Sequence, residues 1–265
     1  MTPDNPLVSA PPKEVPLPRS PLVRVLAQIR FPPIVSIEKR DFIASFQESI
    51  REDYAILRPE QTRGMMLVPQ GVFPMESQVI WRFSDLDNIW RVSLAPDFLA
   101  LETTKYVSRD DFVNRLEVVV YALEKHVGPK VVDRLGVRYI DRITGSAVAK
   151  ISDFVRKEVL GVISAPLSGN AQRVLCESLF QIPSSNSRLL ARWGLIPSGE
   201  TIDPNIIDAI AEPSWILDID MFCAEQQSFN SERMIKDAKQ FSERIYTFFR
   251  WAVTDTFLRF YGGSI

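Results

Sequence analysis

The sequence has little histidine or cysteine, the residues that most often carry nucleophilic catalysis and metal binding. It contains one histidine, His126, and two cysteines, Cys176 and Cys223, that lie far apart. Histidine-rich metal sites and Ser–His or Cys–His catalysis would all depend on His126, whose place at the end of a helical stretch suits an interaction with the helix C-terminus. Two distant cysteines exclude a disulfide framework or a zinc knuckle, and both lie in apolar runs typical of buried thiols.

Catalytic sequence motifs are missing as well. The chain contains no G-x-x-x-x-G-K-[ST] loop, no G-x-G-x-x-G after a strand, no H-E-x-x-H and no G-x-S-x-G. The paired glycines of the final "YGGSI" follow a helical stretch and are expected to end it. The sequence therefore predicts no cofactor and favours a binding protein over an enzyme.

Neither a long apolar run nor an excess of one charge is present. No stretch approaches the roughly 20 apolar residues that span a bilayer, and the N-terminus lacks the pattern of a signal peptide. These observations predict a cytoplasmic protein with no membrane partner. The net charge of −2 is unlike that of a dedicated double-stranded DNA binder, although it permits a local basic patch.

The first 21 residues are rich in proline, which occurs there seven times. They show almost no hydrophobic periodicity, which is typical of an extended or polyproline II segment that cannot bury enough apolar surface to become ordered. Residues 1–21 are therefore predicted to form a flexible arm that could contact a partner. Residues 22–265 are predicted to form a single folded domain.

Hydrophobic periodicity predicts an α+β fold of two similar halves, residues 22–128 and 131–262, each with the order β-α-β(3–4)-α. The strands would form a curved antiparallel sheet with helices on one face, resembling a tandem TATA-binding-protein-like or helix-grip fold. The predicted strands are 22–31, 64–69, 78–84, 88–95, 98–104, 131–143, 171–182, 187–196 and 214–223, and the predicted helices are 36–54, 108–127, 152–160 and 230–261.

Arginines recur at alternate positions of these strands, as in "RLGVRYIDRI" (134–143), so they should share the face opposite the helices. The candidate ligand-binding residues on this face are Arg30, Arg82, Arg138, Arg142, Arg188 and Arg192. The planar fork of arginine suits two-point contacts with carboxylates and phosphates. Two interpretations stay open: a lattice of cross-strand ion pairs, or a surface for an anionic ligand, a nucleic acid or an acidic protein segment.

Asp218 and Asp220 lie two residues apart on the predicted strand 214–223, so both should point to the same side. Two carboxylates could hold Mg²⁺, and together with Arg138 and Arg142 they could act on a phosphate ester or a triphosphate. Triphosphate-tunnel enzymes combine similar residues, but their first strand alternates Glu-x-Glu-x-Lys, whereas "VRVLAQIRF" contains no acid. A Mg²⁺-dependent phosphohydrolase is thus an alternative function.

Three stretches, "PLVRVLAQIRFPP", "RLGVRYIDRI" and "FRWAVTDTFLRFYG", lie at the start, middle and end of the predicted domain. Together they resemble a sporadically distributed bacterial family of uncharacterised proteins about as long as this chain. The resemblance implies no catalytic residues, and a patchy distribution suits an accessory component of a bacterial defence or toxin–antitoxin-like system. The leading prediction is therefore a non-catalytic interaction module with a protein partner. The alternatives are recognition of a nucleic acid or phosphorylated ligand by the arginines, and the phosphohydrolase.

Overall fold

The computed structural model describes residues 4–62, 65–68, 71–74, 78–183 and 185–264. The chain divides into two compact units, each assembled from segments that are distant in the sequence. Unit 1 contains residues 1–25, 137–223 and 240–265, and unit 2 contains residues 26–136 and 224–239. No described helix is long and apolar enough to cross a membrane.

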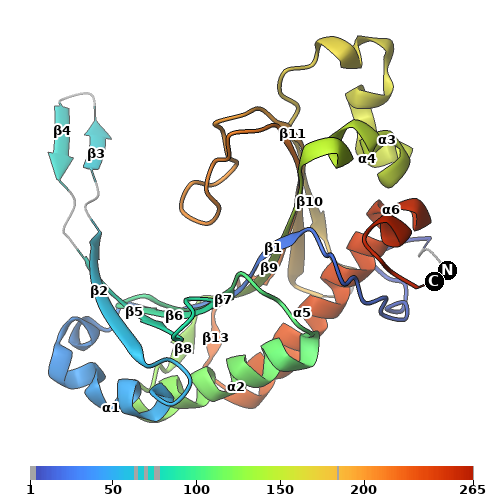
Figure 1. Ribbon diagram of the computed structural model, residues 1–265. Helices are drawn as coiled ribbons and strands as arrows, with labels where there is room; N and C mark the ends of the chain where they lie inside the picture. Colours follow the sequence, from blue (N-terminus) through green and yellow to red (C-terminus); the bar gives the residue numbers. More distant parts are fainter. Residues whose placement is uncertain (1–3, 63–64, 69–70, 75–77, 184, 265) are drawn as a thin grey trace. The chain divides into compact units, whose positions relative to one another are not determined.

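Unit 2 places two helices on one face of its strands (Figure 1). Phe46 of the first helix contacts Phe83, with ring centroids 5.6 Å apart, and Phe112 of the second stacks on Trp90 at 5.9 Å. Phe83 and Trp90 share a face because Val92, two residues from Trp90, pairs with Phe83. The elements are α1 (Arg40–Ile50), α2 (Arg109–His126), β2 (Ile56–Thr62), β5 (Gln78–Ser84), β6 (Trp90–Ala95), β7 (Phe98–Thr103), β8 (Val131–Val132), β13 (Gln227–Ser228), the hairpin β3 (Met65–Val68) and β4 (Gly71–Pro74), and the 3₁₀ turn η1 (Val35–Glu38).

The strands of unit 1 have one face covered by helices and a second face that no described helix of this unit covers (Figure 1). Phe180 of its first complete strand contacts Phe248 of a long helix at a centroid distance of 5.8 Å, which identifies the covered face. The complete elements of this unit are β10 (Cys176–Gln181), β11 (Ser187–Ile196), β12 (Ser214–Cys223), α3 (Ile151–Phe154), α4 (Lys157–Leu160), α6 (Asp255–Phe260) and the 3₁₀ turns η2 (Gly145–Lys150), η3 (Gly161–Ser164) and η4 (Pro166–Asn170). Three further elements are divided between the two units: β1 (Leu22–Arg30), β9 (Arg134–Ile143) and α5 (Ser231–Ala252).

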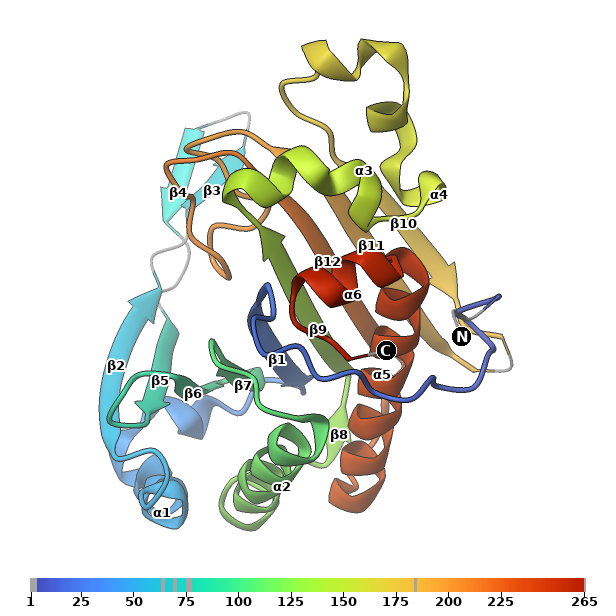
Figure 2. The same cartoon turned by 45° about the vertical axis from the view of Figure 1, so that its right-hand side comes forward.

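Nine strands form one sheet with the order β10-β11-β12-β9-β1-β7-β6-β5-β2. The pairs β10–β11, β11–β12, β2–β5, β5–β6 and β6–β7 are antiparallel. The predicted α+β class with a large antiparallel sheet is therefore confirmed. Strand β10 ends the order on the side of unit 1, where Figure 2 shows it as the outermost strand.

Alternation along β11 and β12 separates two sets of side chains. Leu189, Ala191 and Ile219 are fully buried on the covered side, whereas Arg192 and Asp218 point the other way. We call this second side the open face of unit 1. It includes Arg138, Ile140, Arg142, Glu177, Leu179, Gln181, Arg188, Leu190, Arg192, Ile196, Ile216, Asp218, Asp220 and Phe222.

Two predicted helices are interrupted where the chain forms other hydrogen bonds. The predicted helix 152–160 is split into α3 and α4 because Val155 pairs with Val253 in an isolated antiparallel bridge. The predicted helix 230–261 is split at the same place, and Thr254 then caps α6 by accepting a hydrogen bond from the amide of Phe257 at 3.2 Å. Strands β2 and β4 were not predicted, and residues 64 and 69 of the predicted strand 64–69 lie outside the described residues.

Residues 4–21 form neither helix nor strand, but they contact α5 within unit 1. Arg244 donates hydrogen bonds to the carbonyl oxygens of Pro6 and Ser9, each at 2.8 Å. The amide of Val15 donates to the hydroxyl of Tyr246 at 2.8 Å. Residues 1–3 of the predicted arm lie outside the described residues, and the flexibility of the arm stays a prediction.

Candidate functional site

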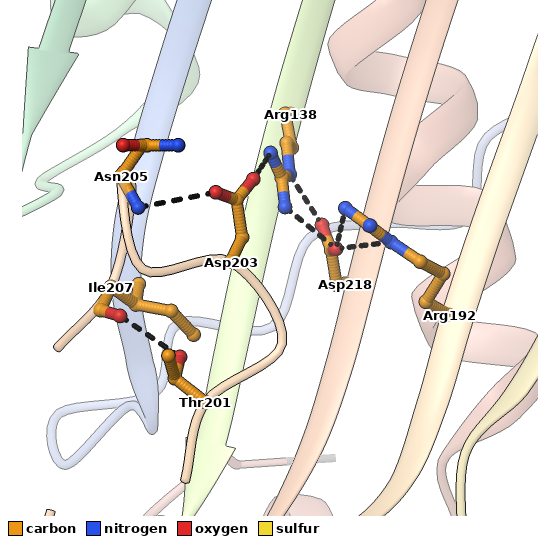
Figure 3. A network of polar contacts seen from close by, with 7 residues as sticks. All are labelled: Arg138, Arg192, Thr201, Asp203, Asn205, Ile207 and Asp218. Carbon is orange, nitrogen blue, oxygen red and sulfur yellow. Dashed lines mark hydrogen bonds and ion pairs between the residues drawn. The ribbon is translucent and has the colours of Figure 1, made fainter. Parts of the chain in front are cut away.

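The open face of unit 1 is organised around Asp218 of β12 (Figure 3). Strand pairing places Arg192 directly opposite Asp218, and Arg138 comes from β9, the next strand in the order. Arg138 donates from Nε to Oδ1 at 2.7 Å and from Nη2 to Oδ2 at 2.9 Å. Arg192 donates from Nε at 2.9 Å and from Nη2 at 2.6 Å, both to Oδ2. One carboxylate is therefore shared by two guanidinium groups.

A second carboxylate, that of Asp203, balances the charge of this network. Its Oδ2 accepts a hydrogen bond from Nη1 of Arg138 at 2.9 Å. The exposed fractions are 1% for Asp218, 10% for Arg138, 20% for Arg192 and 23% for Asp203. Burial alone would lower the pKa of Arg138, but the hydrogen bonds and charges of Asp218 and Asp203 more than offset this effect and raise it. The four groups carry two charges of each sign, so the network is electrically neutral.

Asp203 reaches Arg138 because the loop 197–213, between β11 and β12, folds back over the open face. Inside this loop, Asp203 accepts a hydrogen bond from the amide of Asn205 at 3.3 Å, and the hydroxyl of Thr201 donates to the carbonyl oxygen of Ile207 at 2.9 Å (Figure 3). Apolar contacts anchor the loop to the strands through a buried cluster of Ile140, Ile196, Ile207 and Ile216, against which Ile202 and Ile206 pack. The network is thus held by three neighbouring strands and by a loop that packs against them.

Beyond this network, the open face is apolar in the middle and polar around it. Leu179 is 56% exposed, and Leu190 beside it is half-buried. The three rows of side chains across β10, β11 and β12 are Glu177–Arg192–Asp218, Leu179–Leu190–Asp220 and Gln181–Arg188–Phe222. Arg188 is exposed, so the row Gln181–Arg188–Phe222 presents a cation beside the apolar centre formed by Leu179 and Leu190.

Four of the six predicted arginines lie in unit 1, but only two of them meet. Arg138 and Arg192 share Asp218, as described above. Arg142 donates from Nη2 to the carbonyl oxygen of Asp208 at 2.6 Å. Burial lowers the pKa of Arg142, and the charge of Asp208 acts in the opposite direction. Arg188 lies on the row next to the apolar centre.

The two remaining predicted arginines belong to unit 2. Arg82 donates from Nε to Glu60 at 3.0 Å and from Nη1 to Ser93. Arg30 is exposed and donates to the side chain of Gln28 at 3.3 Å. Both engage neighbours on their own or an adjacent strand, in the manner of cross-strand polar pairs.

The predicted metal pair, Asp218 and Asp220, does lie on one face. Both oxygens of Asp218 accept hydrogen bonds from arginine. In the part of the chain that the structure describes, no three histidine, cysteine, aspartate or glutamate side chains are placed to hold a metal ion. Cys176 and Cys223 are free and only half-buried, so the prediction of buried thiols was wrong.

Sequence reasoning missed two carboxylates of unit 1, those of Asp203 and Asp141. Asp203 lies in a loop without periodicity, although its Asp-Pro step is a turn signal. Asp141 alternates with Ile140 and Arg142, so it lies on the covered face and is 6% exposed. Burial raises the pKa of Asp141 to about 7. Burial, together with the charge of Asp141, raises the pKa of Tyr261 to about 12.

No known protein-family model matches this sequence, and no curated protein is significantly similar to it. Function is therefore inferred from the residues of the open face alone.

Proposed function

We propose that the protein is a non-catalytic interaction module that binds a protein partner on the open face of unit 1. The observation that carries this proposal is the shared use of Asp218 by Arg138 and Arg192. Because these arginines are already neutralised, they serve to fix the surface rather than to attract an anion. The exposed remainder of the face, centred on Leu179, is then the part available to a partner.

The composition of that remainder supports a protein ligand. Leu179 and Leu190 form an apolar centre, and Arg188 and Glu177 lie on the two flanking rows. Protein interfaces commonly combine an apolar centre with a polar rim. A partner that inserts an apolar side chain beside Leu190 and places a carboxylate against Arg188 would complement this surface.

The alternative of an anionic ligand, a phosphorylated molecule or a nucleic acid, requires a cation that is free to bind it. At Arg138 and Arg192 the ligand would have to displace Asp218, whose carboxylate is 1% exposed. The exposed Arg188 would be left, together with the half-buried Arg142, whose Nη2 already donates to the carbonyl oxygen of Asp208, and two separate surface arginines give little affinity for a phosphate backbone. These considerations place the nucleic-acid proposal second.

The phosphohydrolase alternative requires Asp218 to bind Mg²⁺ through its oxygens. Those oxygens receive four contacts of 2.6–2.9 Å from two guanidinium groups. A divalent cation would have to approach through these positive charges, which is electrostatically unfavourable. This proposal is therefore the weakest of the three.

The test is a comparison of tagged full-length variants recovered from the native cells at moderate salt. We expect one protein to co-purify in stoichiometric amount with the wild type, and Arg188→Glu to bind it at least about tenfold more weakly, because an attractive charge pair becomes repulsive. Arg51→Glu is the matched control, since Arg51, which directly follows α1 in unit 2, is 62% exposed. It should retain the partner.

Two results would contradict the proposal. Equal recovery of the partner by Arg188→Glu and by the control would remove the open face as the binding site. Recovery of nucleic acid instead of protein, judged by the absorbance ratio and released steeply by added salt, would favour the alternative ligand.

We also infer that the two predicted halves are related as a tandem arrangement of the TATA-binding-protein-like kind. The strand order within each half supports this inference. In the first half β1 lies beside β7, followed by β6 and β5, and in the second half β9 lies beside β12, followed by β11 and β10. In each half, the first strand lies beside the last strand. The strands before that last one then follow outward in reverse chain order, as a meander.

A further inference from the structure

Strand β10 has one edge without a hydrogen-bonding partner among the described residues. The backbone amides of Val174 and Ile182 both donate to carbonyl oxygens of β11, at 2.9 and 3.0 Å. Because backbone groups alternate in direction along a strand, those of Glu177, Leu179 and Gln181 point away from β11. Apart from β11, no described residue forms a backbone hydrogen bond with β10.

The two terminal strands of the sheet order differ in how their edges are protected. Strand β2, at the other end, contains Pro59 flanked by Arg58 and Glu60, and both proline and charge discourage pairing with another chain. Strand β10, with the sequence CESLFQ, has no proline and a single charge. Its apolar residue Leu179 is 56% exposed, and Leu175 just before it is 44% exposed. Such an edge is a template for strand addition.

The sequence around β10 is complementary to itself in one antiparallel register. When the pairing is centred on Leu179, that residue meets its own copy, Glu177 meets Gln181 and Leu175 meets Pro183, so on the open face apolar meets apolar and polar meets polar. On the covered face Cys176 meets Ile182 and Ser178 meets Phe180. Centring on Ser178 places Glu177 against Leu179. Centring on Glu177 instead brings two carboxylates together, which is unfavourable.

We propose that the protein forms a symmetric homodimer in which β10 pairs antiparallel with β10 of a second copy, centred on Leu179. The outward-pointing amide and carbonyl of Leu179 exchange hydrogen bonds with those of its copy, and Glu177 exchanges them with Gln181 of the second chain. A two-fold interface of this kind uses the same patch on both chains, as closed symmetry requires. The pairing is a self-association and goes beyond the proposed binding of a different protein.

The first experiment measures the mass of the full chain in solution by size-exclusion chromatography with light scattering. We expect twice the chain mass of 30.2 kDa. Leu179→Arg places two guanidinium groups across the two-fold axis and should give the mass of one chain. Leu86→Arg is the matched control, because Leu86 is 78% exposed in the turn between β5 and β6. This control should stay dimeric.

The second experiment tests the register by disulfide formation in a chain carrying Cys176→Ser and Cys223→Ser. Directly opposite residues of a hydrogen-bonded antiparallel pair have Cα atoms about 5.5 Å apart, within the range that a disulfide bridges. Leu179→Cys should therefore form a covalent dimer under mild oxidation. Glu177→Cys should not, because its two copies would lie about 13 Å apart along the strands.

These measurements separate the proposal from its competitors. A wild type that has the mass of one chain at tens of micromolar overturns it. Cross-linking by Glu177→Cys and not by Leu179→Cys overturns the register. A dimer that survives Leu179→Arg places the interface elsewhere. Loss of the dimer in Leu179→Arg with unchanged circular dichroism, together with cross-linking of Leu179→Cys alone, supports it.

Discussion

At the scale of single residues, Asp218 is the group on which the open face depends most. Its buried carboxylate balances Arg138 and Arg192, so its replacement leaves excess positive charge out of water. We expect Asp218→Asn to lower the free energy of unfolding by about 3 kcal/mol, measured by urea denaturation. Glu48→Gln is the control, since Glu48 is 66% exposed in its pair with Arg51, and it should change this free energy by less than about 1 kcal/mol. Equal losses would show that the network contributes little to stability.

Asp141 is the residue that should link stability to pH. Its folded pKa, raised to about 7 by burial, exceeds the unfolded value near 3.9, so the folded chain binds this proton more tightly. The stabilising contribution of this group is therefore complete below about pH 4 and is lost as the pH rises toward 7.

Asp141→Asn should remove this dependence. Between pH 5 and pH 8, the free energy of unfolding of the wild type should fall by about 3 kcal/mol relative to that of Asp141→Asn, measured by urea denaturation at both pH values. Asp87→Asn, at an exposed turn position, should follow the wild type. If the free energies of unfolding of the wild type and of Asp141→Asn changed by the same amount between pH 5 and pH 8, Asp141 would already be ionised in the folded chain at pH 5.

At the scale of elements, the start of α2 depends on Ser108. The side chain of this N-cap residue accepts a hydrogen bond from the amide of Asp111 at 3.1 Å. Ser108→Ala should lower the midpoint of urea denaturation by an amount equivalent to about 1 kcal/mol, because an amide of the first turn loses its partner. Ser108→Gly should cost only a few tenths of that, about 0.3 kcal/mol, since water can reach the amide. The reverse order of the two variants would contradict a capping role.

Elements with regular alternation were predictable from the sequence. The strands 187–196 and 214–223 were predicted with the bounds that the structure has, because one side of each is apolar apart from Ser187 at the start of the former. Strand β2 was missed because Pro59 and two neighbouring charges hide its pattern. The break between α5 and α6 was missed because the bridge of Val253 to Val155 is a long-range contact that local periodicity does not encode.

The candidate site was predictable to a similar extent and for the same reason. Alternation alone placed Arg138, Arg192 and Asp218 on one face, and strand pairing brings them together. Asp203 reaches Arg138 from an irregular loop, so its contact depends on how that loop folds over the strands. The sequence pattern also could not say that Arg30 and Arg82 belong to a different compact unit.

At the scale of the whole molecule, the N-terminal segment offers a direct test. Lys13 and Arg19 are sites for trypsin, and the neighbouring Val15 is hydrogen-bonded to Tyr246. We expect slow cleavage at both sites in the native chain, and faster cleavage in Tyr246→Phe, followed by mass spectrometry over time. Immediate cleavage of the wild type would instead establish the flexible arm that the prolines predict.

The sharing of one carboxylate by two arginines has a consequence for how this sequence can vary. Each single substitution at positions 138, 192, 203 or 218 leaves an uncompensated charge, whereas joint replacement of all four by apolar residues of similar volume can preserve the fold. The four positions are therefore expected to show strong epistasis. Related chains should retain all four residues together or have exchanged all four, and intermediates with one of them changed should be rare.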